Sequence, residues 1–347
     1  MFTKTLINAC ERGLVPDALV RRGIRRLLMK RLAKVDQGSV AANQAAASSL
    51  VDDFSRGPIA IVPEKANEQH YEVPAELYRF MLGPRGKYSS CFWPEGCDSL
   101  ATAEDFALEQ TCLNAKIEDG QSILELGCGW GALTLWMARQ YPNANIVAVS
   151  NSNSQREFIE ALAVESNVAD RVKVITCDMN DFEIEQSFDR VVSIEMFEHM
   201  RNHSELLKRI SSWLTREGCL LVHIFCHKSL TYEFRDEGDD DWMSRHFFSG
   251  GIMPSADFLR RFEGQLSVEA YWKWNGRHYQ KTCDAWLRNM DTNRGKVLQV
   301  LRSNYGSGEE SRWFNRWRMF HMACSELFGF EGGDEWFVSH YRFAKNG

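Results

Sequence analysis

The sequence predicts an α/β protein built on a doubly wound parallel sheet. Between residues 116 and 227, short apolar runs alternate with segments of helical periodicity, which is the order of strand–helix–strand units. The first apolar run ends in the glycine-rich stretch "ELGCGWG". Polar side chains gather where the predicted strands end, and this is the edge at which such sheets bind ligands.

Composition narrows the class of protein. The chain has 347 residues, of which 44% are hydrophobic and 25% charged, an ordinary soluble composition. A net charge of −6 argues against nucleic acid as a partner, since a basic surplus would be expected there. We find neither a bilayer-spanning apolar run nor the apolar core of a signal peptide in "MFTKTLINACERG". Ten cysteines without regular spacing indicate reduced thiols, so a cytoplasmic location is predicted.

Residues 1–115 form the first of three predicted parts, a helical region that contributes to the cofactor and substrate sites. "LVRRGIRRLLMKRLAKV" has helical spacing, with Leu27, Leu28 and Leu32 on or near one face. This helix packs on the main domain or, as other basic amphipathic helices do, touches an anionic membrane. "GSVAANQAAASS" is a weak helix or a linker. The aromatic-rich residues 68–93 are expected to form a structured loop.

Residues 116–227 form the second part, the sheet core. Five strands are expected in "QSILELGCG", "ANIVAVSNS", "RVKVITCDM", "FDRVVSIEM" and "GCLLVHIFCH". The intervening helices are expected in "ALTLWMARQY", "QREFIEALAVESN" and "HSELLKRISSWL", the last of them capped by Asn202 or Ser204.

Residues 228–347 form the third part, in which the alternation stops. The stretch after the fifth strand is too long for a simple loop, and we expect it to form a lid over the site. Two further strands, "LSVEAYWKWN" and "EWFVSHYRFA", flank a helical section from about 279 to 330 and complete the sheet.

The glycine-rich turn is the first candidate for ligand binding. Gly127, Gly129 and Gly131 allow close approach of a ligand to the backbone. Their G-x-G-x-G spacing differs from the dinucleotide fingerprint and from a P-loop. Glu125, two residues before the first glycine, is an acid that could bind an ammonium group rather than a phosphate.

These motifs together resemble a known family. "ELGCGWG" is similar to the first motif of class I S-adenosylmethionine (SAM) methyltransferases. "HYEVP", "KYSSCFW", "GCGWG" and "MFEHM" follow the order of the cyclopropane fatty-acid synthase superfamily. "HIFCHKSLTYEF", "DDDWMSRHFFSGGIMPS" and "ELFGFEGGDEWFVSHYRF" resemble its coclaurine N-methyltransferase group, which methylates tetrahydroisoquinoline nitrogens. The similarity extends from about residue 14 to the end, and it implies a Rossmann-like sheet of seven strands.

The resemblance implies SAM as the cofactor. The "KYSS" motif and the glycine-rich turn would hold its methionine part, residues after the second strand its ribose, and residues after the third strand its adenine. The predicted cofactor-binding residues are Tyr88, Ser89, Glu125, Gly127, Gly129, Ser150, Asn151, Gln155, Asp178, Met179 and Ile194. For Gln155 and Asp178, helix capping or simple solvent exposure is the alternative.

"SIEMFEHMRNH", residues 193–203, is the candidate catalytic stretch. An amine must lose its proton before it accepts a methyl group, and a carboxylate or an imidazole can take that proton. Glu198 and His199 match the binding and base residues of the N-methyltransferase group, and Glu195 matches an acid of its pocket. Alternatively, Glu198 and His199 satisfy each other and cap the next helix. His203 is expected to be solvated.

The resemblance also implies substrate-binding residues. Trp317 and Phe320 are candidate walls for a flat aromatic substrate, or else part of a helix face packed on the core. Tyr71 and His223 are further candidates. No metal is expected, although His199 and His203 are four residues apart, because methyl transfer from a sulfonium needs none.

The predicted function is SAM-dependent N-methylation of a small aromatic amine, a coclaurine-type tetrahydroisoquinoline. The alternative is carbon methylation of an unsaturated lipid chain, as in cyclopropane synthases, which hold a bicarbonate base with Cys, Glu, His and Tyr. Here these positions match Ser90, Glu198, His223 and Phe320, so two members of that cage differ. A catalytically silent SAM-binding scaffold is a third reading. The oligomeric state stays open, with a homodimer as one option.

Overall fold

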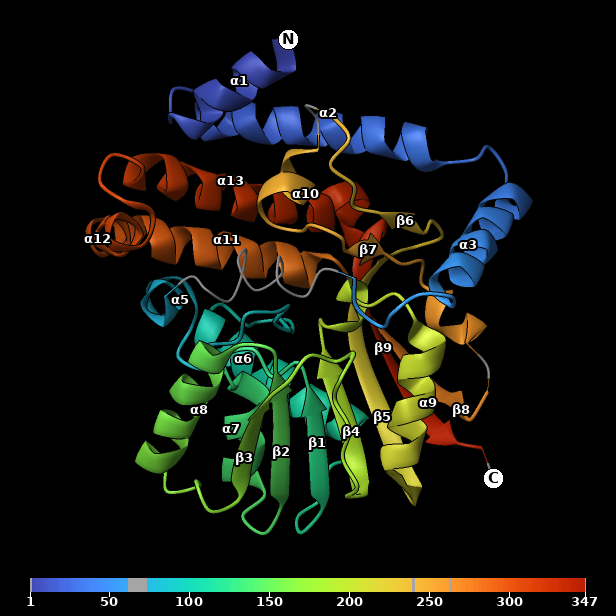
Figure 1. Ribbon diagram of the computed structural model, residues 1–347. Helices are drawn as coiled ribbons and strands as arrows, with labels where there is room; N and C mark the ends of the chain where they lie inside the picture. The colour runs from blue at the N-terminus through green and yellow to red at the C-terminus, as the bar shows by residue number, and fades with distance from the viewer. Residues whose placement is uncertain (1, 62–73, 239–240, 263, 347) are drawn as a thin grey trace.

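The predicted strands assemble into one seven-stranded sheet, which confirms the expected fold class (Figure 1). The computed structural model describes residues 2–61, 74–238, 241–262 and 264–346. The strand order is β3-β2-β1-β4-β5-β9-β8, with β1 to β5 parallel and β9 antiparallel to both of its neighbours. The strands are β1 (Ser122–Leu126), β2 (Asn145–Ser150), β3 (Val172–Thr176), β4 (Phe188–Ile194), β5 (Leu214–His227), β8 (Leu266–Trp274) and β9 (Trp336–Lys345).

Helices cover both faces of the sheet. One face packs on α6 (Leu100–Asn114), α7 (Ala132–Gln140) and α8 (Asn153–Glu165). The other face packs on α3 (Val40–Phe54), α9 (His203–Trp213) and the short turn η3 (Phe258–Arg261). Strand residues are buried on both faces, as continuous apolar runs in a parallel sheet require. Asn202 accepts the N–H of Glu205 and so caps α9, one of the two predicted caps.

A second layer of helices lies over the carboxyl ends of the parallel strands (Figure 1). Its apolar residues form a separate cluster that joins the two ends of the chain. The layer consists of α1 (Phe2–Glu11), α2 (Asp17–Val35), α5 (Ala75–Met81), α11 (Arg277–Thr292), α12 (Arg294–Tyr305), α13 (Glu310–Gly329) and η4 (Phe330–Gly333). The expected lid contains β6 (Tyr232–Glu233), α10 (Trp242–His246) and β7 (Ile252–Met253).

Three local expectations are settled by the structure. The "GSVAANQAAASS" stretch is helical, because Ser39 caps α3 by accepting the N–H of Ala42. The aromatic-rich region is not all loop, since its described part contains α5. Strand β5 begins at Leu214 instead of residue 218, so it follows α9 without the expected break.

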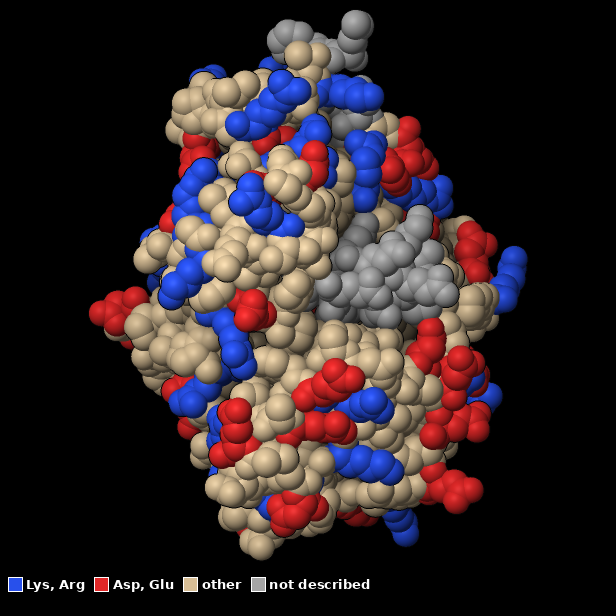
Figure 2. Space-filling model, turned by 60° about the vertical axis from the view of Figure 1, so that its left-hand side comes forward, with Lys and Arg blue, Asp and Glu red and all other residues tan. Residues whose placement is uncertain are grey.

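The basic helix α2 packs on α13. Its Arg21 donates to Asp284 and Glu326, and Arg25 donates to Glu326. Lysine and arginine side chains gather on the upper part of the face in Figure 2, with acidic groups among them. Within the described residues, each helix is too short or too polar to cross a bilayer.

Candidate active site

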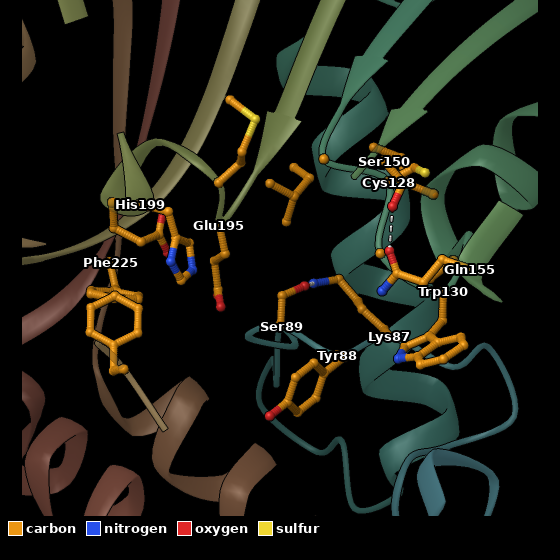
Figure 3. Close-up of a pocket in the computed structure, with 18 of the residues that line it drawn as sticks. Lys87, Tyr88, Ser89, Cys128, Trp130, Ser150, Gln155, Glu195, His199 and Phe225 are labelled. Carbon is orange, nitrogen blue, oxygen red and sulfur yellow. Dashed lines mark hydrogen bonds between the residues drawn. The ribbon is translucent and has the colours of Figure 1, made fainter. Parts of the chain in front are cut away.

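A cavity lies between the carboxyl ends of β1, β2 and β4 and the helical layer (Figure 3). The glycine-rich turn, the loop before α6 and the turn after β4 form one side. Residues of α11, α13 and the β6–β7 segment form the other. The predicted residues that line it are Tyr88, Ser89, Glu125, Gly127, Gly129, Ser150, Asn151, Gln155, Asp178, Met179, Ile194, Glu195, Glu198, His199 and Phe320.

The glycine-rich turn has the backbone that close approach of a ligand requires. Gly127 and Gly129 have φ values of +79° and +52°, which side chains other than glycine rarely adopt. A Cβ added to Gly127 would lie 2.9 Å from the Cβ of Met196, whereas one added to Gly129 would meet no atom of the described residues within 4 Å. Gly129 therefore faces open space in the cavity.

Two buried donors that lie near this turn have no hydrogen-bond partner among the described residues. Ser150 donates to the Gln155 amide oxygen at 2.7 Å. This leaves Gln155 Nε2, together with Trp130 Nε1, buried without a hydrogen-bond partner in the described part of the chain. Because unpaired buried donors are costly, both are suited to acceptor atoms of a bound ligand. The donor set and the open glycine turn fit the expected nucleoside cofactor.

Glu125 is an acid at the end of β1, 2% exposed. Thr134 donates to its Oε2 at 2.5 Å. Burial raises the pKa of Glu125 to about 8, although the Thr134 hydrogen bond acts in the opposite direction. A cationic group in the cavity would stabilise the charged form, which is compatible with the predicted ammonium partner.

The loop that carries Tyr88 and Ser89 is held by two buried charges that sequence reasoning missed. Glu104 on α6 accepts the backbone N–H groups of Arg85 and Lys87 at 2.8 and 3.2 Å. The Lys87 ammonium, 3% exposed, donates to Ser89 Oγ and to the Ser90 carbonyl, both at 2.6 Å. Acids and lysines usually lie at the surface, so nothing local in the sequence marks this pair.

Glu195 directly follows β4 and has a strained backbone, with a φ of +50°. Its Oε1 accepts the Ser90 N–H at 2.9 Å and lies 3.2 Å from His223 Nε2. Its Oε2 accepts the Tyr279 hydroxyl at 2.6 Å. Burial raises the pKa of Glu195, and the positive charge of Lys87 opposes this shift. Glu195 is thus an anchored carboxylate at the centre of the cavity (Figure 3).

Glu198 lies one turn further, in the short turn η2 (Phe197–His199), and differs from Glu195 in its partners. It is fully buried, and neither carboxylate oxygen has a hydrogen-bond partner among the described residues. Burial, followed by the charge of Glu195, holds the pKa of Glu198 well above its usual range. An unpaired carboxylate in a cavity is a binding site for a cation.

His199 follows Glu198 and also lines the cavity. Its ring packs against Phe248 of the lid segment, with ring centroids 4.8 Å apart. Figure 3 shows it beside Phe225 and turned toward the same space as Glu195. The ring of His199 and the carboxyl group of Glu198 therefore line one cavity.

The end of the cavity near His199 has an apolar wall of aromatic, methionine and aliphatic side chains. It comes from β5, the lid segment and α13. Its members are Phe225, Phe234, Met243, Phe248, Met253, Phe320, Leu327 and Phe328. Phe320, a predicted substrate-binding residue, is among them. The segment after β5 also lies over the cavity, as a lid would.

Other predicted site residues lie elsewhere. Trp317 is fully buried behind Phe320, with ring centroids 5.8 Å apart, and does not line the cavity. His223 is fully buried beneath Glu195. Tyr71 lies outside the described residues.

His203 is not solvated, contrary to expectation. It is fully buried, and its two ring nitrogens lie 2.9 Å from the carbonyl oxygens of Arg201 and Phe197. The ring stabilises the turn between η2 and α9. Over the part of the chain that the structure describes, no group of three or more potential ligands is arranged for a metal ion.

Comparisons with known proteins agree with this geometry. Residues 61–334 match the mycolic acid cyclopropane synthetase family. The (S)-coclaurine N-methyltransferase of Thalictrum flavum subsp. glaucum is 35% identical over 344 residues, covering 98% of this chain and 95% of that protein.

Two solved structures are similar to this chain over most of its length. Coclaurine N-methyltransferase bound to N-methylheliamine and S-adenosylhomocysteine superposes with a TM-score of 0.94 at 36% identity, covering 98% of this chain and 99% of that one. The cyclopropane synthase MmaA2 of Mycobacterium tuberculosis shares the fold, with a TM-score of 0.70 at 20% identity, covering 81% and 98% of the two chains.

Proposed function

The chain is a coclaurine N-methyltransferase-like member of the mycolic acid cyclopropane synthetase family of SAM-dependent methyltransferases, and we propose that it methylates the nitrogen of a tetrahydroisoquinoline. One observation carries the proposal. Glu198 is fully buried, and its carboxyl group has no hydrogen-bond partner among the described residues. It lines the same cavity as the glycine-rich turn and the aromatic wall. This arrangement fits a flat molecule that carries one cationic nitrogen.

The residues divide the chemistry between them. Bound SAM supplies a methyl group on a sulfonium, which a neutral amine attacks directly. The Glu198 carboxylate binds the amine in its protonated form, and His199 accepts the proton that must leave before attack. Glu195 stays anchored and adds a second negative charge beside the cationic reactants. The aromatic wall orients the substrate, and a ring next to an ammonium contributes about 0.5–2 kcal/mol.

The lipid reading receives less support from the cavity. Phe320 lines the wall and carries no hydroxyl group. Ser90 and His223 are both fully buried and contact Glu195 from behind, so they do not form a cage around the cavity with Glu198. The relatives of the chain named above are N-methyltransferases at higher identity than the cyclopropane synthase.

An acceptor screen tests the proposal. Purified protein with SAM should form S-adenosylhomocysteine with simple tetrahydroisoquinolines, and dispersed unsaturated phospholipids should give only the background rate. Methylation of the phospholipid without methylation of the amine would overturn the proposal. A protein that binds SAM and turns over neither class would be the silent scaffold.

Two variants test the assigned roles. Glu198→Gln should raise the KM for the amine, and His199→Ala should lower kcat, while both still bind S-adenosylhomocysteine in calorimetry. Leu113→Ala, an exposed position on α6, is a control that should change neither. Loss of cofactor binding in both active-site variants would make these residues structural.

The remaining expectations concern partners and location. We propose that α2 braces the helical layer, because Arg21, Arg25 and Arg31 pair with acids of the same chain. Membrane contact would use its exposed outer face, where Leu19 and Met29 lie, and cosedimentation with anionic vesicles measures it.

All ten cysteines are free, which supports the cytoplasm as the site of action. Light scattering would show whether the protein forms the homodimer that the sequence left open.

A further inference from the structure

A chain of buried polar side chains runs from Glu195 away from the cavity. His223 Nε2 lies 3.2 Å from Glu195 Oε1, and His340 Nε2 lies 2.7 Å from His223 Nδ1. Asn114 Nδ2 then lies 3.0 Å from His340 Nδ1. The two histidines are paired across β5 and β9, and Asn114 ends α6. Three elements far apart in sequence therefore meet behind one carboxylate.

Both imidazole rings are neutral in this setting. His223 and His340 are each 0% exposed, and burial holds the pKa of both well below its usual range. Trp274 covers them, with ring centroids 5.3 and 4.2 Å from His223 and His340. A neutral imidazole has one N–H donor and one acceptor nitrogen, so each ring passes a hydrogen bond in one direction only.

Only two arrangements satisfy all three contacts. In the first, the Asn114 amide N–H donates to His340 Nδ1, His340 Nε2–H donates to His223 Nδ1, and His223 Nε2–H donates to Glu195. In the second, every donor is reversed, which requires a protonated Glu195 and the Asn114 oxygen facing His340. The first arrangement matches a charged Glu195, which also accepts from Ser90 N–H and the Tyr279 hydroxyl.

We propose that Asn114, His340 and His223 are positioning residues that keep Glu195 charged and aimed into the cavity by directing every donor of the chain toward it. The expected effect on catalysis rests on the proposed function. The direction of the hydrogen bonds does not depend on any substrate. Reversal of the chain would store a proton on Glu195 and remove one negative charge from beside the cationic reactants.

Other groups also face Glu195 and contribute to its charge state. Burial raises the pKa of Glu195, and the Lys87 ammonium favours its carboxylate form. The charge of Glu195 in turn helps to keep the proton on the nearby Glu198. Tyr279, Cys91 and Cys283 are neutral at working pH, because burial raises the pKa of each. All these groups are the same in wild type and in the His340 variants. A shift of the pH profile on altering His340 is therefore due to the lost hydrogen-bond chain.

The direct test reads the tautomers without any acceptor. In protein labelled with ¹⁵N-histidine, the signals of His223 and His340, identified by their loss in single variants, should both show the Nε2–H tautomer. Neither should titrate between about pH 6 and 8, where an ordinary histidine does. An Nδ1–H tautomer or an imidazolium at either ring in that range would overturn the proposal.

The kinetic test uses a matched pair of variants. His340→Phe keeps a ring against Trp274 but removes both nitrogens, whereas His340→Gln keeps an N–H that can donate to His223. With a tetrahydroisoquinoline acceptor, His340→Phe should lower kcat/KM about tenfold and move its acidic limb to higher pH. His340→Gln should restore most of both. His321→Phe, at another fully buried histidine, should leave the acidic limb in place.

The outcomes are separable. An unmoved acidic limb in His340→Phe, or equal damage from the Phe and Gln variants, would overturn the positioning role. Affinity for S-adenosylhomocysteine should stay unchanged in both, which distinguishes the role from a defect in folding. If His340→Phe does not fold, Asn114→Leu at the outer end of the chain is read in the same way. Absence of turnover in the wild type would count against the proposed function, and the tautomers would still decide the chain.

Discussion

The hydroxyl of Tyr279 lies 2.6 Å from Oε2 of Glu195, joining helix α11 of the upper layer to the end of strand β4. This hydrogen bond crosses from one layer of the molecule to the other at the centre of the cavity. Tyr279 is buried, and its ring stacks on Phe328 with centroids 4.2 Å apart. Its position is therefore fixed by packing, and its hydroxyl holds the carboxylate in one orientation.

Tyr279→Phe should lower kcat about tenfold, since it removes one hydrogen bond to a charged group. Packing against Phe328 should keep the variant folded, and its affinity for S-adenosylhomocysteine should match that of the wild type. Tyr271→Phe is the control, because the Tyr271 hydroxyl shares a hydrogen bond with Ser339 and this residue does not line the cavity. Equal kcat values for Tyr279→Phe and wild type would show that Glu195 needs no donor from α11.

Glu198→Gln should make the ligand-free protein more stable at pH 8. The folded state binds the Glu198 proton more tightly than the unfolded chain does, because burial raises the pKa of this group. Its contribution to the free energy of unfolding is thus largest below the unfolded pKa and is lost as pH rises. The variant should gain about 1 kcal/mol or more over wild type at pH 8.

Urea denaturation at several pH values measures this difference. The gap between the variant and wild type should shrink toward about pH 3, where the carboxyl is protonated in both states. A gap independent of pH would mean that the substitution acts through packing and not through charge. A more stable but less active variant would show that Glu198 is retained for function.

Local sequence pattern predicted the parts of the site that follow strands. Gly127, Gln155 and Glu198 come directly after buried apolar runs or open the next helix, and parallel strands bring their carboxyl ends to one edge. The family resemblance then supplied the roles. Both kinds of inference work because these side chains are fixed by the backbone segment that carries them.

Contacts between residues far apart in the sequence could not be predicted from local sequence pattern. His340 lies 117 residues from His223, and only the pairing of β5 with β9 places them together. Glu104 would pass for an exposed helix residue, yet it reaches back to the loop before α6. His203 was expected in solvent because a helix start is usually exposed, but the rings of Phe258 and Phe262 pack on it and two backbone carbonyls contact its nitrogens.

Affinity for SAM should rise with pH between about 6 and 8. In the ligand-free protein, burial raises the pKa of Glu125 to about 8, so the group is mostly protonated at pH 7. An ammonium group bound beside it favours the carboxylate, and binding should therefore release a proton below pH 8.

Calorimetry in buffers of different ionisation enthalpy measures the released proton. Glu125→Gln should release none and should bind SAM more weakly, with an affinity that varies less with pH. Glu118→Gln, an exposed acid just before β1, should behave as wild type. Proton release that survives in Glu125→Gln would assign the proton to another group.

Gly127→Ala and Gly129→Ala should fail in different ways although both lie on the same turn. Each places a side chain at positive φ, at a cost of about 1 kcal/mol. Gly127→Ala also brings its Cβ to 2.9 Å from the Cβ of Met196. Its free energy of unfolding should therefore fall by about 2 kcal/mol or more even without ligand. The new methyl of Gly129→Ala meets no atom within 4 Å in the part of the chain that the structure describes, so its ligand-free stability should fall only by the backbone strain. If the cofactor occupies that open space, Gly129→Ala should still lose most of its SAM affinity in calorimetry. Normal SAM binding by Gly129→Ala would place the cofactor away from this turn.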